Sequence, residues 1–318
     1  MPNARGVESD TLLSVVEFIA ANWRLAAVAA LFFVGVAARR AGLAGPNHGR
    51  WLLNFVFNVG LPILIFGALT GVPLAREHAL LPVTAICISL AGWGAAAFVS
   101  RRFGLPKTGE GAMALCSMSI NNSMIYPFAA LSLGAAAFSQ LVMFDMGHAI
   151  LVWTVTTVAA CKYGGHADDI PVLLKRTLAA PPLWVLFISL GLNVGGAPIP
   201  KQFLHSVLLV GQALILLVPL AMGLLVSAQG LRRPEVWSAV VLRSGFGALM
   251  GLVLGYAFGL QGTAGAIAIV AGAAPIGFTA VVLSSREGLD LDLAATAAAV
   301  SVFLGSLWIP LAMTLIKA

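Results

Sequence analysis

The sequence predicts an all-α membrane protein that crosses the bilayer ten times, in two inverted repeats of five helices. Composition is the first reason, because the chain of 318 residues is 60% hydrophobic and 9% charged, with a mean hydropathy of +0.98. A soluble domain carries about 25% charged residues, so this chain cannot cover a water-facing surface. Its apolar runs are long rather than alternating, and a backbone in lipid must pair its polar groups internally, so helices are expected.

The number and length of the apolar runs are the second reason. A helix needs ~20 apolar residues to cross about 30 Å of hydrocarbon. Three of the ten runs contain Asp, Glu, Lys, Arg or His. The first run contains Glu17 and Arg24, the fifth contains Asp145 and His148, and the eighth contains Arg243. In chain order the expected spans are 15–38, 51–69, 80–99, 111–133, 139–160, 178–194, 207–229, 237–258, 263–284 and 293–316.

The basic residues between the runs are the third reason. Cytoplasmic loops of membrane proteins carry an excess of Lys and Arg. Along this chain alternate gaps hold 3, 3, 3, 2 and 1 basic residues, whereas the gaps between them hold 1, 0, 1 and 0. Merging or splitting one run would destroy this alternation, so it supports ten spans. It also places both termini outside the cytoplasm.

Matching segments in the two halves predict the inverted repeat. LPILIFGALTG around Pro62 resembles VPLAMGLLVSA around Pro219, and AGWGAAAFVSRRFGL resembles SGFGALMGLVLGYAFGL. The fourth run contains Pro127, and the ninth contains Pro275 at the corresponding place. An odd number of spans in each half inserts the second copy upside down, as in many secondary transporters.

The fourth run is predicted to be interrupted near its proline. Pro127 has no backbone N–H and blocks the hydrogen bond to the carbonyl of Ser123, four residues earlier. Lipid cannot satisfy the backbone groups that are freed there. Asn121 and Asn122 supply amide donors and acceptors in the same turn.

The ninth run is predicted to be interrupted in the same way. Gly272 and Gly277 flank Pro275 and allow another backbone or a ligand to approach closely. Two such breaks that cross would form a small polar binding site within the bilayer. The alternative is that each proline only kinks its helix, while the asparagines join neighbouring helices. Asn58, in the second run, is either a further polar lining residue or a helix contact.

Ionisable residues within the spans are further candidates, because charges in the bilayer are costly and are commonly functional. Asp145 and His148 are three residues apart and so share a helix face. They form either a proton-linked pair, since histidine titrates near neutral pH, or a structural hydrogen bond. Arg243 either attracts an anion or extends its side chain toward the basic gap that holds Arg232 and Arg233.

Other classes of protein are not expected. The sequence has no HExxH, GxSxG or P-loop motif, and its longest hydrophilic segment, 162–177, is too short to form a catalytic domain. Cys87, Cys116 and Cys161 are scattered without metal-ligand spacing and are predicted to be small apolar fillers. The net charge of +6 comes from the gaps between spans, so no nucleic-acid partner is expected. The sequence therefore predicts neither an enzyme nor a bound cofactor or metal.

Several motifs resemble the auxin efflux carrier family of membrane transporters, and more distantly the bile acid:sodium symporter family. The similarity extends from about Ala37 to Leu315. It includes the broken fourth run and, at four further places, the segments ARRAGL, FNVGLPILIFGAL, FDMGHAILVWT and PIGFTAVVLSSREGLDLDLAATAAAVSVFLGSLWIPL.

The resemblance implies a division into two moving parts. Segments 1–75 and 178–234 would form a scaffold domain, segments 76–161 and 235–318 a transport domain, and 162–177 a cytoplasmic linker. The fourth and ninth helices would cross at their prolines, and the transport domain would move in an elevator mechanism. The carboxylate of the substrate would bind at Asn121 or Asn122. The chain departs from the family pattern at Tyr126, directly before Pro127, and at Ile120.

The resemblance also implies a function. A bacterial member would lie in the cell inner membrane and transport small organic anions, such as auxin-like monocarboxylates, malate or malonate. The coupling ion would be a proton or sodium, or there would be none. The alternatives are a sodium-coupled symporter of the bile-acid type, a membrane receptor that binds an anion without moving it, and a channel. The oligomeric state stays open between a monomer and a homodimer.

Overall fold

The computed structural model describes residues 23–70, 79–125, 140–166, 171, 175, 178–226 and 229–317. These residues are mostly helical, and the β-type pairing among them is a single antiparallel bridge between Ile120 and Ile276. Six of the described helices are long and apolar enough to cross a membrane. They are Pro46–Leu69, Leu80–Phe103, Gln140–Gly165, Lys201–Leu225, Pro234–Ala257 and Leu291–Ile309. The prediction of a helical, multi-pass membrane protein is confirmed, whereas the count of ten spans stays a prediction.

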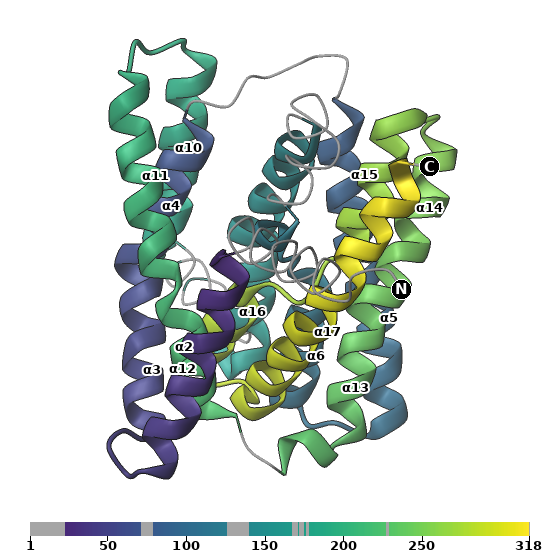
Figure 1. Cartoon of the computed structure of the whole chain (residues 1–318). Helices are drawn as coiled ribbons and strands as arrows, with labels where there is room; N and C mark the ends of the chain where they lie inside the picture. The colour runs from purple at the N-terminus through teal and green to yellow at the C-terminus, as the bar shows by residue number, and fades with distance from the viewer. Residues whose placement is uncertain are drawn as a thin grey trace, which may run out of the picture.

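One group of helices lies at the left of Figure 1. Its helices cross closely: a Cβ added to Gly223 of α12 would collide with the carbonyl oxygen of Phe32 in α2, and one added to Gly67 of α4 would lie 2.6 Å from the backbone nitrogen of Leu208 in α11. Small residues at such crossings let helix backbones pack tightly in membranes. The group comprises α2 (Trp23–Arg40), α3 (Pro46–Phe55), a π-helical segment (Val56–Gly60), α4 (Leu61–Leu69), α10 (Pro181–Val194), α11 (Lys201–Ile215) and α12 (Leu217–Leu225).

The second group of helices fills the centre and right of Figure 1. The helix 140–166 contains two π-helical segments, Val152–Thr156 and Lys162–His166, on either side of α8 (Thr157–Cys161). A third such segment, Val241–Phe246, joins α13 to α14. The remaining helices are α5 (Leu80–Phe103), α6 (Lys107–Met118), α13 (Pro234–Val240), α14 (Gly247–Ala257), α15 (Gly262–Gly272), α16 (Phe278–Glu287) and α17 (Leu291–Lys317).

Proline and glycine set several of the helix ends. Pro46, Pro181 and Pro234 each occupy the first position of a helix, where the missing N–H has no helical partner in any case. Gly104 and Gly288 end α5 and α16 in the left-handed conformation, with φ of 61° and 69°. These prolines and glycines stand at the ends of the helices, so they set where each helix begins or ends and do not interrupt it.

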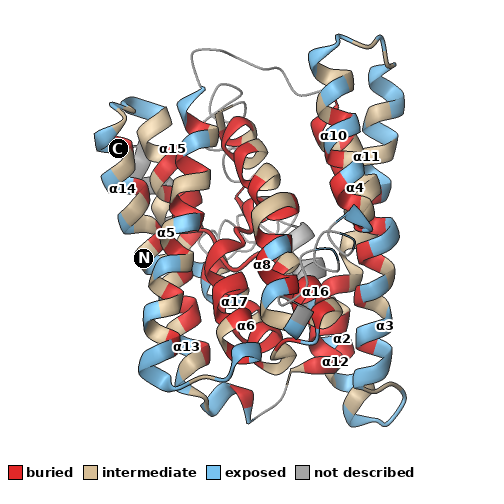
Figure 2. Ribbon diagram, turned by 180° about the vertical axis from the view of Figure 1, so that it is seen from behind, coloured by how far each residue is buried: buried red, intermediate tan, exposed pale blue. Residues whose placement is uncertain are grey.

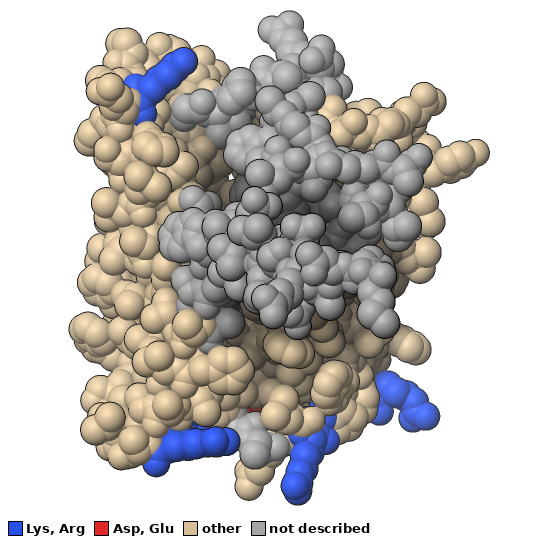
Figure 3. Space-filling model, viewed as in Figure 1, with Lys and Arg blue, Asp and Glu red and all other residues tan. Residues whose placement is uncertain are grey.

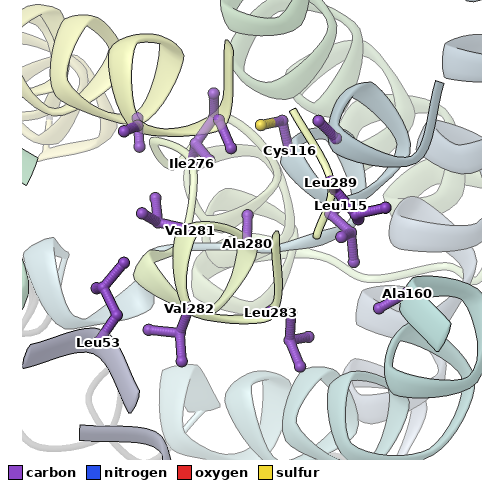
Figure 4. Packing of buried hydrophobic residues seen from close by; sticks show 14 of the residues in the cluster. Leu53, Leu115, Cys116, Ala160, Ile276, Ala280, Val281, Val282, Leu283 and Leu289 are labelled. Carbon is purple, nitrogen blue, oxygen red and sulfur yellow. The ribbon is translucent and has the colours of Figure 1, made fainter. Parts of the chain in front are cut away.

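The buried residues concentrate in the middle of the molecule, and large apolar side chains cover much of its outside. Figure 2 shows burial along α6, α16 and α17, with exposed positions on the outer faces of α3, α11, α13 and α14. In Figure 4, Val281 and Leu283 of α16 lie between Leu53 on one side and Leu115 on the other. Exposed apolar side chains are what a lipid-facing surface requires. They include Phe33, Trp184, Phe187, Leu252, Tyr256 and Phe303.

Basic residues gather at one end of the molecule. Figure 3 shows Lys and Arg along the lower edge, where α2 and α5 end in basic residues and Arg232 and Arg233 precede α13, and one further basic group at the upper left. At the lower end Arg233 donates to Asp290 across 2.7 Å. Burial opposes ionisation of Asp290, but the hydrogen bond and attraction from Arg233 and the backbone N–H of Leu293 together lower the pKa of Asp290. The same pair raises the pKa of Arg233.

Two boundaries differ from the sequence prediction. The fifth helix continues through the π-helical segment Lys162–His166, so the segment expected as a linker from residue 162 begins inside it. The glycine at position 165, with φ of 85°, departs from helical geometry within this segment. The fourth helix begins at Lys107 and α6 already ends at Met118. Pro127 and Tyr126 lie outside the described residues.

Candidate functional site

The chain after the end of α6 meets the connection between α15 and α16 at the centre of the molecule. The chain is extended after the end of α6, and it pairs there with the segment that joins α15 to α16. The N–H of Asn121 donates to the carbonyl of Pro275, and the N–H of Gly277 donates to the carbonyl of Ser119, both across 2.9 Å. A Cβ on Gly277 would lie 2.9 Å from the carbonyl oxygen of Ile120, so this approach requires glycine.

The break in the fourth helix therefore begins several residues before the position expected from Pro127. Asn122–Met124 form a short 3-10 turn, which contains the backbone of Ser123. The reason is tertiary: the N–H of Asn121 and the carbonyl of Ser119 pair with the segment that joins α15 to α16, and the N–H of Ile120 pairs with His148.

A hydrogen-bond network holds the break against the fifth helix. The N–H of Ile120 donates to Nε2 of His148 across 2.8 Å. Nε2 must then be unprotonated, which leaves the proton of the neutral imidazole on Nδ1. Nδ1 lies 3.6 Å from Oδ1 of Asp145, and the same oxygen accepts a hydrogen bond from Nδ2 of Asn122 across 2.8 Å. A chain of polar contacts therefore runs from the backbone of Ile120 through His148 and Asp145 to the side chain of Asn122.

A cavity of about 160 Å³ opens beside this network. On one side it is lined by apolar residues of α4 and by Ile215 of α11. On the other side its polar lining comes from the break, the fifth helix and the start of α16, namely Asn121, Asn122, Asp145, His148 and Thr279. The cavity thus lies between the two groups of helices.

Two polar atoms at this cavity have no hydrogen-bond partner among the described residues. They are the amide oxygen of Asn122 and the hydroxyl of Thr279, and both are buried. Buried polar atoms are normally satisfied, so such atoms beside a cavity favour a bound ligand or water. Thr279 is in the first turn of α16, where the free N–H groups of the helix favour negative charge.

Arg243 forms hydrogen bonds at the C-terminal ends of α6 and α15. It is 1% exposed, and its guanidinium donates to the carbonyls of Ser117 across 2.8 Å, Ala274 across 3.3 Å and Gly272. Ser117 is in the last turn of α6, and Gly272 ends α15. Helix C-termini carry unpaired carbonyls and partial negative charge, so a buried cation fits this position.

The position of Arg243 corrects both sequence interpretations of this residue. Its side chain does not extend to the membrane surface, because it is buried and bonded within the protein. It is also not among the residues that line the cavity, so it does not meet an anion there.

The structure brings together five of the residues singled out from the sequence. Asn121, Asn122, Asp145, His148 and Gly277 all line the one cavity. Their roles in binding substrate or a coupling ion stay predictions.

The other candidates lie elsewhere. Pro275 is buried and accepts a hydrogen bond from the break, while Gly272 ends α15 under Arg243. Asn58 is exposed and donates to Asn54, and it does not line the cavity. Pro127, as noted, is outside the described residues, and of Ser123 only the backbone is described.

Sequence reasoning missed Thr279 and the apolar wall from α4 and α11. A signal for Thr279 was present, because a polar residue two positions after Gly277 falls in the first turn if a helix restarts there. No comparable signal marks the apolar wall, since its leucines and isoleucines resemble those of every other span.

Comparison with known proteins places the chain among transporters. The family described as "Membrane transport protein" matches residues 23–313. An uncharacterised transporter of Methanothermobacter thermautotrophicus is 24% identical over 301 residues, which cover 92% of this chain and 98% of that protein. An uncharacterised transporter of Methanocaldococcus jannaschii is 24% identical over 276 residues, covering 84% and 89%. These matches confirm the resemblance to the auxin efflux carrier family, and the chain belongs to the membrane transport protein family.

Proposed function

We propose that the protein is a secondary transporter of small organic anions, with carboxylates such as malonate, malate or auxin-like monocarboxylates as the substrate class. The observation that carries this proposal is the cavity between the two helix groups, where an interrupted helix restarts and buried polar atoms have no partner among the described residues. The carboxylate would bind at the first turn of α16, with Thr279 and the amides of Asn121 and Asn122 as donors.

The architecture that accompanies this function is the inverted repeat. α5 packs against α6 in the first half, and α14 packs against α15 in the second. These are corresponding pairs if the chain has ten spans with interrupted fourth and ninth helices. The helix group of α2–α4 and α10–α12 would be the scaffold. The other group would move against it as the transport domain and carry the cavity across the membrane.

The topology follows from the basic end of the molecule. The connections rich in Lys and Arg lie together at the lower end in Figures 1 and 3, and this end would face the cytoplasm of a cell with an inner membrane. Lys201, which begins α11, lies in a connection that the same rule assigns to the outside.

The carboxylate of Asp145 makes coupling to a cation the favoured mechanism. Its side chain is 34% exposed and lies at the same cavity as the start of α16. An ionised Asp145 would repel an anionic substrate across so small a space. A proton or a sodium ion bound at Asp145 would remove that repulsion, and the free oxygen of Asn122 suits either a cation or a hydroxyl donor of the substrate.

The test is counterflow of radiolabelled malonate in proteoliposomes, with malate and an auxin-like monocarboxylate as competitors. We expect saturable exchange in the wild type and none after Asn121→Ala with Asn122→Ala. Gln202→Ala is the matched control, because Gln202 is an exposed amide that lines neither this cavity nor the second one described below. Unchanged affinity in the double variant would refute the site.

The same assay separates the alternatives. A receptor would bind malonate without flux, and a channel would conduct without saturable exchange. Imposing a sodium gradient and a pH gradient separately identifies the coupling ion. Acceleration by sodium alone would favour the sodium-coupled mechanism.

A further inference from the structure

A second cavity lies between the two helix groups, closer to the basic end of the molecule. Its volume is about 250 Å³, and it is lined by Arg50 and Asn54 of α3 and by Val282, Ser285 and Arg286 of α16. Val282 also lines the first cavity, so the two spaces adjoin through one side chain.

The polar atoms that line this second cavity are mainly hydrogen-bond donors. None of its five lining residues is acidic. The amide oxygen of Asn54 accepts a hydrogen bond from Asn58 across 3.1 Å, which directs the NH₂ of Asn54 elsewhere. Arg50 is exposed and makes no hydrogen bond or ion pair with the described part of the chain. Its guanidinium therefore keeps its donors for a ligand.

Arg286 is held in place from two directions. Its guanidinium carbon lies 4.2 Å from the ring centroid of Phe57, and its Nε lies 3.2 Å from the carboxylate of Glu287. The ring and the carboxylate fix the plane of the guanidinium, so the side chain of Arg286 loses little further conformational entropy when a ligand binds. Glu287 neutralises Arg286, and Arg50 then gives the site a net charge of about +1.

We propose that Arg50, Asn54, Ser285 and Arg286 form a second anion site, which binds the carboxylate or phosphate group of a small oxyanion. A guanidinium pair suits such a group because each can donate two parallel hydrogen bonds. The volume is below that of ordinary drug-sized pockets, so the ligand is small or presents only a headgroup. Because Val282 borders both cavities, this site would also be an entrance to the substrate cavity. That role rests on the proposed function, whereas the binding of an oxyanion does not.

The test counts bound equivalents of radiolabelled malonate by equilibrium dialysis, with the protein in a maltoside detergent that contains no phosphate. We expect two equivalents in the wild type and one after Arg50→Gln, with Arg50→Lys binding the second equivalent more weakly. Arg232→Gln is the matched control, because Arg232 is an exposed arginine with no side-chain partner among the described residues. Since Arg50 is exposed, its replacement should leave folding intact, which a single gel-filtration peak verifies.

Two further arms separate the possible outcomes. In the Asn121→Ala and Asn122→Ala background, one equivalent should remain and should still require Arg50, and inorganic phosphate should displace it. This arm stands even if malonate is not transported. In nanodiscs with phosphatidylglycerol, loss of the Arg50-dependent equivalent would identify a lipid phosphate as the occupant, and its retention a soluble anion. Equal binding by wild type and Arg50→Gln, or an equal loss in Arg232→Gln, would overturn the proposal.

Discussion

Replacing Arg243 by methionine tests whether this side chain holds the two interrupted helices together. The substitution keeps much of the side-chain length but leaves the carbonyls of Ser117, Gly272 and Ala274 without their buried donor. Hydrogen bonds to a charged group contribute about 1.5–3 kcal/mol each. Removing the charge also recovers its desolvation penalty, so the net loss expected for breaking such a buried cluster is about 3–5 kcal/mol.

The assay has a global and a local readout. Thermal unfolding in detergent should occur about 5–10 °C lower in Arg243→Met than in the wild type. Locally, the thiol of Cys116 is fully buried next to Ser117 at the end of α6, and it should become reactive toward a maleimide. The buried Cys161 in the fifth helix should stay protected and serves as the internal control.

Two further variants sharpen this prediction. Arg243→Lys should be intermediate, because an ammonium cannot reach all the carbonyls that the planar guanidinium spans. Arg232→Met, at an exposed position, should unfold like the wild type. The reasoning is refuted if Arg243→Met unfolds at the wild-type temperature while Cys116 remains protected.

Three other changes give distinct expectations. His148→Gln keeps an acceptor for the N–H of Ile120, so saturable exchange should persist, whereas His148→Leu leaves that buried N–H unpaired and should abolish exchange. His205→Gln on an exposed face should change nothing. Wild-type exchange in His148→Leu would contradict a role for this hydrogen bond in the site. Gly277→Ala forces a Cβ against the backbone of Ile120, so it should weaken malonate binding at least tenfold with little loss of folded protein; wild-type affinity would contradict the close crossing. Asp290→Asn should lower the free energy of unfolding by about 1 kcal/mol at neutral pH. Folding lowers the pKa of Asp290, so the ionised carboxylate stabilises the protein at pH values above the pKa that Asp290 has in the unfolded state. This stabilisation is lost as the pH falls through the lower pKa that Asp290 has in the folded state. Chemical denaturation across pH should therefore show the variant and the wild type converging in acid, and a constant difference would contradict the ion-pair explanation.

Much of this architecture could be predicted because it depends on local or compositional signals. The membrane class follows from hydropathy, and the break in the ninth helix follows from Pro275 and its flanking glycines. The shared face of Asp145 and His148 follows from helical spacing. Each of these needs only the residues within a few turns of the feature.

The remaining features depend on partners that are distant in sequence. The fourth helix breaks at residues 119–121, where no proline or glycine stands, because Pro275 and Gly277 supply partners for its backbone. Arg243 was misinterpreted for the same reason, since its partners are backbone carbonyls 29 to 126 residues away. A carbonyl has no residue type, so no motif can reveal that contact.

The arrangement of helix ends is the physical reason for which we propose an anion as the ligand of this junction. Two C-termini, those of α6 and α15, meet at Arg243, and their partial negative charge is compensated there. The N-terminus of α16 has no side-chain cap among the described residues, and it borders the cavity together with Asp145. The local field is then set by one positive helix end and one carboxylate that a coupling cation can neutralise. If Arg243 were removed, the uncompensated carbonyls would oppose the field of α16, so anion affinity should fall even in a variant that remains folded.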